Sequence, residues 1–204
     1  QGQICLCGSR IFVEEPIYEA FKKGFVEKIK QLKIGDPFDP KTNQGAVVSE
    51  DHMKKVLACI DLAKEEGGTI IAGGNRVVLE GDLADGYYIE PTIIEGLPFD
   101  CRTNQEEIFG PVVTIAPFKT EEEVIKYANS TLYGLASCIW TENLTKAHRL
   151  AASLETGIVW INCWLVRDLR TPFGGVKNSG VGREGGFEAL HFFTEPQNIC
   201  VKIQ

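Results

Sequence analysis

The fold is decided by residues 112–161, which begin Val112-Val113-Thr114-Ile115-Ala116-Pro117 and end Gly157-Ile158-Val159-Trp160-Ile161. Both ends, and residues 135–140 between them, are rich in β-branched and apolar side chains and predict strands. A capping box, Thr120 to Glu123, opens one intervening helix. Asn143 or Thr145 opens the other, which is expected to end near Gly157.

Strands that alternate with helices in this way predict parallel neighbours joined by right-handed crossovers. The expected fold class is therefore α/β, with an open, twisted, mainly parallel sheet and helices on both faces.

The residues before this stretch continue the alternation. One helix is expected after Pro16, because proline suits the first helical position. A second is expected to start at Ser49 or Glu50 and to stop at Gly67-Gly68, before a strand at 69–72. Residues 73–86 predict an exposed, turn-rich insertion.

Composition excludes several classes of function. The chain has 204 residues, of which 44% are hydrophobic, which is enough to bury a substantial core. Its formal net charge of -7 argues against nucleic-acid binding. The most apolar stretch, 157–166, is too short for a bilayer and contains Asn162, so no membrane association is expected.

The seven cysteines are scattered without the spacing of a disulfide framework or a zinc site. We therefore expect a reducing compartment, namely the cytoplasm, and no bound metal.

One cysteine lies in a context that suits chemistry. Gly2-Gln3-Ile4-Cys5 precedes Leu6-Cys7-Gly8-Ser9-Arg10, which places Cys5 in a turn of small residues before a β-like run. A thiolate attacks aldehyde and acyl carbons readily, so Cys5 is a candidate nucleophile. The alternative is a buried apolar cysteine, the commonest role of a free thiol.

Two further motifs follow in order, Glu106-Glu107-Ile108-Phe109-Gly110-Pro111-Val112 and Pro172-Phe173-Gly174-Gly175-Val176-Lys177-Asn178-Ser179-Gly180-Val181-Gly182-Arg183-Glu184. Together with the Cys5 motif they resemble the aldehyde dehydrogenase superfamily over essentially the whole chain. The resemblance implies a catalytic domain over 1–193 and a carboxy-terminal tail or oligomerisation strand over 194–204.

The chain opens on Gln1 inside the first motif, so we expect a carboxy-terminal fragment whose amino-terminal NAD-binding domain is absent. The family's general-base glutamate and oxyanion asparagine match no residue here.

The resemblance also implies roles for single residues. Cys5 becomes the nucleophile that forms a thiohemiacetal and then a thioester on the way to a carboxylic acid, and Cys7 is a bystander. Glu107 and Phe109 match positions that contact the ribose beside the nicotinamide, so the implied cofactor is NAD, with NADP left open. The alternative for Glu107 is a plain surface carboxylate.

The segment from Asn162 to Gly186 looks most like the branch that oxidises 2-aminomuconic or 2-hydroxymuconic semialdehyde. Arg167 stands where other members often have an aromatic pocket residue, and its guanidinium suits a substrate carboxylate. Phe173 matches a tunnel-wall aromatic. The alternative is that Arg167 pairs structurally with Asp168 or with a carboxylate outside this chain, while Arg170 is structural or at the pocket rim.

The final stretch, 198–203, alternates apolar and polar residues as an edge strand or a strand paired with a partner does. In the family this strand commonly pairs with a neighbouring subunit, which implies a homodimer or homotetramer; the alternative is an internal strand.

Two other functions stay open, a general aliphatic or betaine aldehyde dehydrogenase and an inactive partner-binding domain. We assign surface or packing roles to the three histidines, His52, His148 and His191.

Overall fold

The computed structural model describes residues 1–203. The chain divides into two compact units, Gln1–Thr131 and the residues from Leu132 onward, and each is described by itself.

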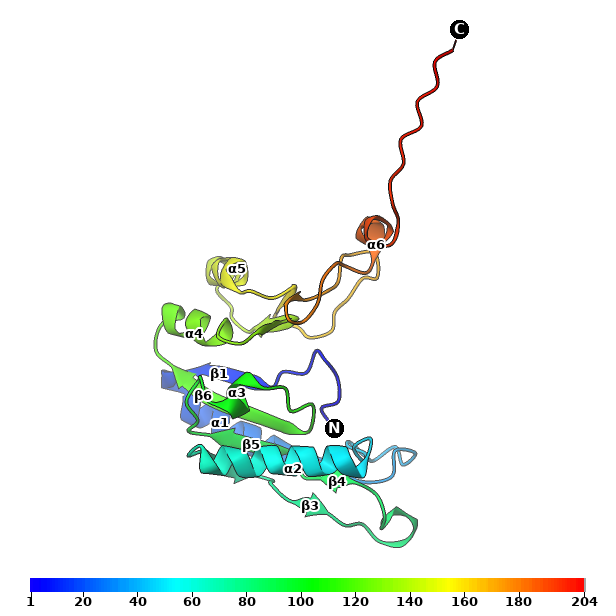
Figure 1. Ribbon diagram of the computed structural model, residues 1–204. Helices are drawn as coiled ribbons and strands as arrows, with labels where there is room; N and C mark the ends of the chain where they lie inside the picture. Colours follow the sequence, from blue (N-terminus) through cyan, green and yellow to red (C-terminus); the bar gives the residue numbers. More distant parts are fainter. Residues whose placement is uncertain (204) are drawn as a thin grey trace. The chain divides into compact units, whose positions relative to one another are not determined.

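The first unit is built on a four-stranded sheet with the order β1 (Arg10–Glu14), β6 (Val112–Phe118), β5 (Thr92–Glu95) and β2 (Thr69–Ala72) (Figure 1). β1, β6 and β5 are parallel, and β2 is antiparallel to β5. The expected pairing of β6 with the strand at 135–140 was wrong, because both of its edges pair with strands that precede it. The apolar pattern of β6 identifies a buried strand but carries no information on its partners.

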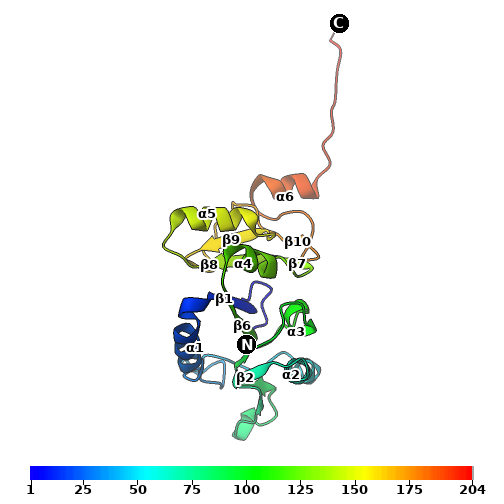
Figure 2. The ribbon, with the colours of Figure 1, turned by 90° about the vertical axis from the view of Figure 1, so that its left-hand side faces the viewer.

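Helices cover both faces of this sheet, as predicted. On β5, Ile93 packs into a cluster with α1 (Glu15–Ile29), while Ile94 points to the opposite face and packs against α2 (Glu50–Glu65). Figure 2 shows the two helices on opposite sides of the sheet. The face of α2 that packs on the sheet consists of Met53, Val56, Ile60 and Ala63, all buried.

The helices begin close to the residues that the sequence predicts. Pro16 lies in the first turn of α1, and the Ser49 hydroxyl caps α2 by accepting the His52 N–H at 3.2 Å. Thr120 caps α4 (Glu121–Ala128) in the same way.

A short helix, α3 (Arg102–Gln105), precedes β6. Residues 73–86, expected as an exposed, turn-rich insertion, include β3 (Arg76–Val77), which pairs with β4 (Tyr88–Ile89), and a 3₁₀ turn, η1 (Gly81–Leu83).

The second unit contains β8 (Ala136–Ile139), α5 (Leu144–Ser153) and β9 (Ile158–Ile161), and β8 and β9 are parallel neighbours, as predicted. Asn143 caps α5, which ends earlier than the expected Gly157. A separate pair joins β7 (Tyr133–Gly134) to β10 (Val176–Lys177).

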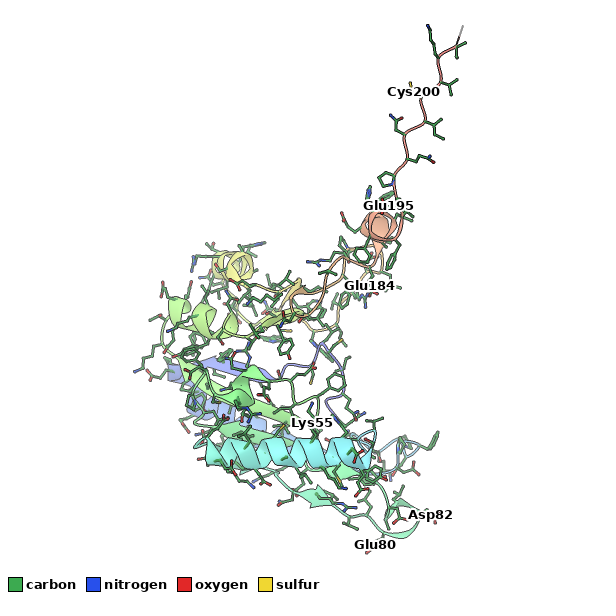
Figure 3. The ribbon with its side chains drawn as sticks, in the orientation of Figure 1. Lys55, Glu80, Asp82, Glu184, Glu195 and Cys200 are labelled. Atoms are coloured by element: carbon green, nitrogen blue, oxygen red, sulfur yellow. The ribbon has the colours of Figure 1, made fainter. Side chains whose placement is uncertain are left out.

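The last helix, α6 (Gly186–Phe193), ends where the predicted tail begins. Residues 194–203 carry no assigned helix or strand, and Glu195 and Cys200 mark this extended segment in Figure 3. Within the described chain, 198–203 therefore forms no internal strand. Among residues 1–203 no helix has the length and apolar character needed to cross a membrane.

Candidate active site

The candidate nucleophile lies in a tight turn of the first unit. The Cys7 N–H donates to the Ile4 carbonyl at 3.0 Å, and Leu6 points into the protein while Cys5 and Cys7 are exposed. Partial desolvation raises the pKa of the Cys7 thiol above its ordinary value. The exposure of Cys5 is at odds with the alternative of a buried apolar cysteine.

A close backbone approach connects this turn to the second motif. Gly2 has a φ of +76°, and a Cβ built on it would lie 2.1 Å from the Gly110 carbonyl oxygen. The Gln3 side-chain oxygen accepts the Val48 N–H at 3.1 Å. Only glycine fits between these two backbones, so Gly2 allows the residues before Cys5 to pack against the second motif, and Gln3 adds a hydrogen bond to Val48.

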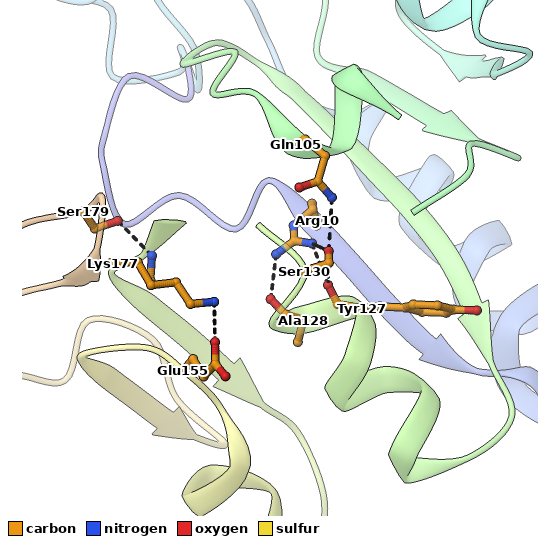
Figure 4. A network of polar contacts seen from close by, with 9 residues as sticks. Arg10, Gln105, Tyr127, Ala128, Ser130, Glu155, Lys177 and Ser179 are labelled. Carbon is orange, nitrogen blue, oxygen red and sulfur yellow. Dashed lines mark hydrogen bonds and ion pairs between the residues drawn. The ribbon is translucent and has the colours of Figure 1, made fainter. Parts of the chain in front are cut away.

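Arg10 anchors the residues that leave the turn (Figure 4). From the start of β1 its guanidinium donates to the carbonyls of Tyr127 and Ala128 at 2.8 and 3.0 Å, and to the Ser130 hydroxyl at 3.4 Å. These carbonyls end α4, where a cation is favourable because it satisfies free acceptors and complements the helix dipole.

The second motif presents two side chains of different character. Glu107 is exposed, and within residues 1–203 its carboxylate has no hydrogen-bond or ion-pair partner, whereas Glu106 is held by Arg102 at 2.8 Å. Phe109 is half-buried, and its φ of +61° is a left-handed conformation that is unfavourable for phenylalanine. A free acceptor beside an aromatic face suits a ligand with both hydroxyl groups and a planar ring.

Side chains of helix α2 bind main-chain carbonyls of this motif, a role that the sequence did not predict for them. His52 Nε2 donates to the Phe109 carbonyl at 2.7 Å, and Lys55 Nζ donates to the Glu107 carbonyl at 3.0 Å. The imidazole also meets the Phe109 ring edge to face, with centroids 6.3 Å apart. No motif surrounds His52, and its contact spans 57 positions of the chain, so the sequence carries no signal for it.

Arg167 and Phe173 lie together in the second unit. The Arg167 guanidinium carbon stacks 3.9 Å from the centroid of the Phe173 ring, and Nη2 donates to the Glu184 carboxylate. Asp168 binds Arg170 instead, at 2.9 Å. The predicted alternative of an Arg167–Asp168 pair is therefore wrong, and Arg170 has a structural partner.

Both side chains line a cavity of about 160 Å³. Two contacts shape it: Trp160 Nε1 donates to the Val166 carbonyl at 2.9 Å, and Phe173 and Glu184 exchange both backbone hydrogen bonds at 2.8 Å. The other lining residues are Ile158, Val159, Thr171 and Pro172. A cavity that combines apolar and polar surface with one cationic side chain suits a small organic molecule that carries a carboxylate.

The model of the aldehyde dehydrogenase family matches residues 1–199 of this sequence. The chain belongs to the aldehyde dehydrogenase family. Its first two sequence motifs form the turn that carries Cys5 and the Glu107–Gly110 segment in the first unit, and Pro172 and Phe173 of the third motif line the Arg167 cavity in the second.

Among characterised members of the family, the chain is 49% identical over 202 residues to the 2-hydroxymuconic semialdehyde dehydrogenase of Pseudomonas putida, covering 99% of this chain and 42% of that protein. It is 48% identical to the 2-aminomuconic 6-semialdehyde dehydrogenase of a Pseudomonas species, again with 99% of this chain and 41% of that protein covered.

The betaine aldehyde dehydrogenase of Staphylococcus aureus, solved in complex with NAD+, superposes with a TM-score of 0.90 at 40% identity, covering 100% of this chain and 42% of that one. The chain therefore spans about two fifths of the length of the relatives that it matches.

Proposed function

We propose that this chain forms the nucleophile-bearing part of an NAD-dependent dehydrogenase that oxidises an aldehyde to a carboxylic acid through Cys5. The observation that carries this proposal is the contact between Gly2 and Gly110, which joins the turn of an exposed thiol to the segment of Glu107 and Phe109. The general base and the oxyanion asparagine of the family are expected outside residues 1–204.

In the proposed reaction the Cys5 thiolate forms a carbon–sulfur bond with the aldehyde carbon, and the carbonyl oxygen becomes an oxyanion. The backbone N–H of Cys5 is a donor for that oxyanion. Departure of a hydride leaves a thioester on Cys5, and water then cleaves the carbon–sulfur bond to release the acid and regenerate the thiol. Access to solvent at Cys5 is consistent with both the attack and the hydrolysis.

NAD, when bound, supplies the acceptor for the hydride. The residues present fit this cofactor: within residues 1–203 the Glu107 carboxylate has no partner and would accept from ribose hydroxyls, and the half-buried Phe109 ring would pack beside a planar heterocycle. NADP carries the same two groups and is the alternative.

For the substrate we propose a muconic-type semialdehyde, whose carboxylate Arg167 binds. Within residues 1–203 only Nη2 of this guanidinium has a hydrogen-bond partner, Glu184, so the remaining N–H donors are available to a ligand in the cavity. Stacking on Phe173 fixes the plane of the guanidinium, which reduces the entropy lost when a carboxylate binds.

One observation favours a second candidate, an uncharged aldehyde such as an aliphatic or betaine aldehyde. The ion pair with Glu184 already compensates the charge of Arg167. If that pair is only structural, the cavity is neutral overall and gains nothing from a carboxylated substrate.

A chimera tests the activity. Residues 1–204 replace the matching part of the Pseudomonas putida enzyme, and NAD reduction is followed by absorbance with 2-hydroxymuconic semialdehyde. We expect turnover, a thioester on Cys5 by mass spectrometry, and a loss of at least about 1,000-fold in Cys5→Ser. Cys7→Ser is the matched control and should retain activity. An active Cys5→Ser chimera, or an acyl group on another cysteine, would refute the role of Cys5.

We also propose a homo-oligomer in which 198–203 pairs with a neighbouring subunit, supported by the exposed apolar side chains of Ile199, Val201 and Ile203 in an extended segment. The cytoplasm is the proposed location, since all seven cysteines are free. Light scattering of the chimera with and without 195–204 tests the first point, and the truncated form should dissociate.

A further inference from the structure

We infer that α2 clamps the cofactor-binding segment, with His52 and Lys55 as positioning residues that hold the main chain of Glu107 and Phe109. This inference rests on the proposed function, because it assigns a purpose to the same segment. Lys55 is visible on α2 in Figure 3.

The spacing of the contacts defines the clamp. His52 and Lys55 are three residues apart on one helix, so their side chains leave from the same side. Their targets, the carbonyls of Phe109 and Glu107, are two residues apart on the motif. A carbonyl oxygen only accepts, so His52 Nε2 carries the proton in this bond.

The clamp opposes a conformational preference. The left-handed backbone of Phe109 is unfavourable for a side chain with a Cβ, and such a residue keeps that conformation only when its surroundings hold it. The bond from His52 to the Phe109 carbonyl acts on that residue directly, and the edge-to-face ring contact adds to it. Without these contacts the backbone relaxes and the Phe109 ring turns away from its present position.

The first turns of α2, which contact the motif, are themselves held in place. Ser49 caps α2 through the N–H of His52, and the buried Val56 side chain lies 2.6 Å from where a Cβ on Gly110 would stand. A Cβ at position 110 would force the buried Val56 side chain to shift, so Gly110 lets the motif approach α2 closely enough for the His52 bond.

The test uses the active chimera with His52→Ala, His52→Gln and His52→Asn. Glutamine carries an amide N–H near the place of Nε2, whereas the shorter asparagine does not reach it. We expect His52→Ala and His52→Asn to raise KM for NAD and Kd for NADH, the latter measured by fluorescence titration, by about 3- to 10-fold. kcat and the aldehyde KM should change little, and His52→Gln should restore both cofactor constants.

Controls separate the clamp from general damage. His148→Ala removes an exposed histidine. Lys54→Met is the matched control for Lys55→Met, because Lys54 forms an ion pair with Glu50 at the surface. Both controls should keep wild-type constants, while Lys55→Met should weaken NADH binding about 2- to 3-fold.

Hydrogen exchange gives a readout independent of turnover: the backbone of 107–110 should exchange faster in His52→Ala than in His52→Gln. Unchanged exchange and unchanged NADH affinity in His52→Ala overturn the clamp even if the enzyme is active. Faster exchange and weaker NADH binding in a chimera that oxidises no aldehyde support the clamp and refute only the proposed reaction.

Discussion

Replacing Gly2 with alanine inserts a methyl group where the segment that leads into the Cys5 turn contacts the second motif. The new Cβ would lie 2.1 Å from the Gly110 oxygen and 2.5 Å from the Gly110 carbonyl carbon. Cβ atoms essentially never come within 3.0 Å of such atoms, so the two backbones must separate by about 0.9 Å, the difference between 3.0 and 2.1 Å. The φ of +76° adds about 1–2 kcal/mol of backbone strain for any residue with a Cβ.

A displacement of this size moves the Cys5 turn relative to Glu107 and Phe109. Misplacing a reacting group by about 1 Å costs on the order of 100-fold in rate. We therefore expect kcat/KM of the Gly2→Ala chimera to fall about 100-fold, which corresponds to about 2.7 kcal/mol of lost transition-state stabilisation.

Gly8→Ala is the matched control for this experiment. Gly8 lies three residues after Cys5, has no positive φ, and has nothing within 4 Å of the position of a Cβ. Its kcat/KM should stay within about threefold of the wild type. The reasoning is refuted if Gly2→Ala also stays within that range, or if both variants lose activity equally.

Two further predictions concern stability, measured by urea unfolding of the chain. The Thr103 hydroxyl and N–H both donate to the Glu66 carboxylate. Burial raises the pKa of this carboxyl, but the hydrogen bonds outweigh burial and lower the pKa overall. The carboxylate therefore stabilises the fold above the ordinary pKa of about 4.3, and this stabilisation is lost as the pH falls through the lower pKa of the folded state. Glu66→Gln should therefore be less stable by about 1 kcal/mol at pH 7 and equal to the wild type at low pH, with Glu65→Gln as a neutral control; a constant difference at all pH values would contradict the assignment. Arg10→Met should lower the free energy of unfolding by about 1–3 kcal/mol, because it leaves the carbonyls at the end of α4 unsatisfied. Arg76→Met, at an exposed position, should leave it unchanged. Equal effects of the two substitutions would argue against a capping role for Arg10.

The local elements of the fold could be predicted because their signals are local. Ser49, Thr120 and Asn143 each place a hydroxyl or amide where it caps the following helix, and all three helices begin there. Ile93 and Ile94 illustrate the limit, since their neighbouring side chains enter cores on opposite faces of one sheet. A strand buried on both faces has the same apolar sequence pattern whichever strands flank it, so this pattern could not predict which strands pair with β6.

The candidate site follows the same division. Cys5, Glu107 and Phe109 are candidates because sequence motifs contain them, and Arg167 is one because it stands where other members of the family often have an aromatic pocket residue. The partner of Arg167 was not identified, since Glu184 reaches it through the bridge that pairs Phe173 with Glu184 across ten intervening residues. Contacts between distant segments depend on the path of the chain, which no local motif encodes.

The most direct test of the account is the substrate preference that Arg167 confers on the chimera. kcat/KM is measured with NAD for 2-hydroxymuconic semialdehyde and for an uncharged aldehyde of similar length, in the wild type, Arg167→Ala and the control Arg170→Ala. We predict that Arg167→Ala lowers kcat/KM about 30- to 150-fold for the carboxylated substrate alone. This is the loss expected when a charge-assisted pair worth about 2–3 kcal/mol is removed. Arg170→Ala should preserve the preference for the carboxylated substrate. Equal losses for both substrates, or a wild type without preference, would contradict the account and leave Arg167 as a structural partner of Glu184.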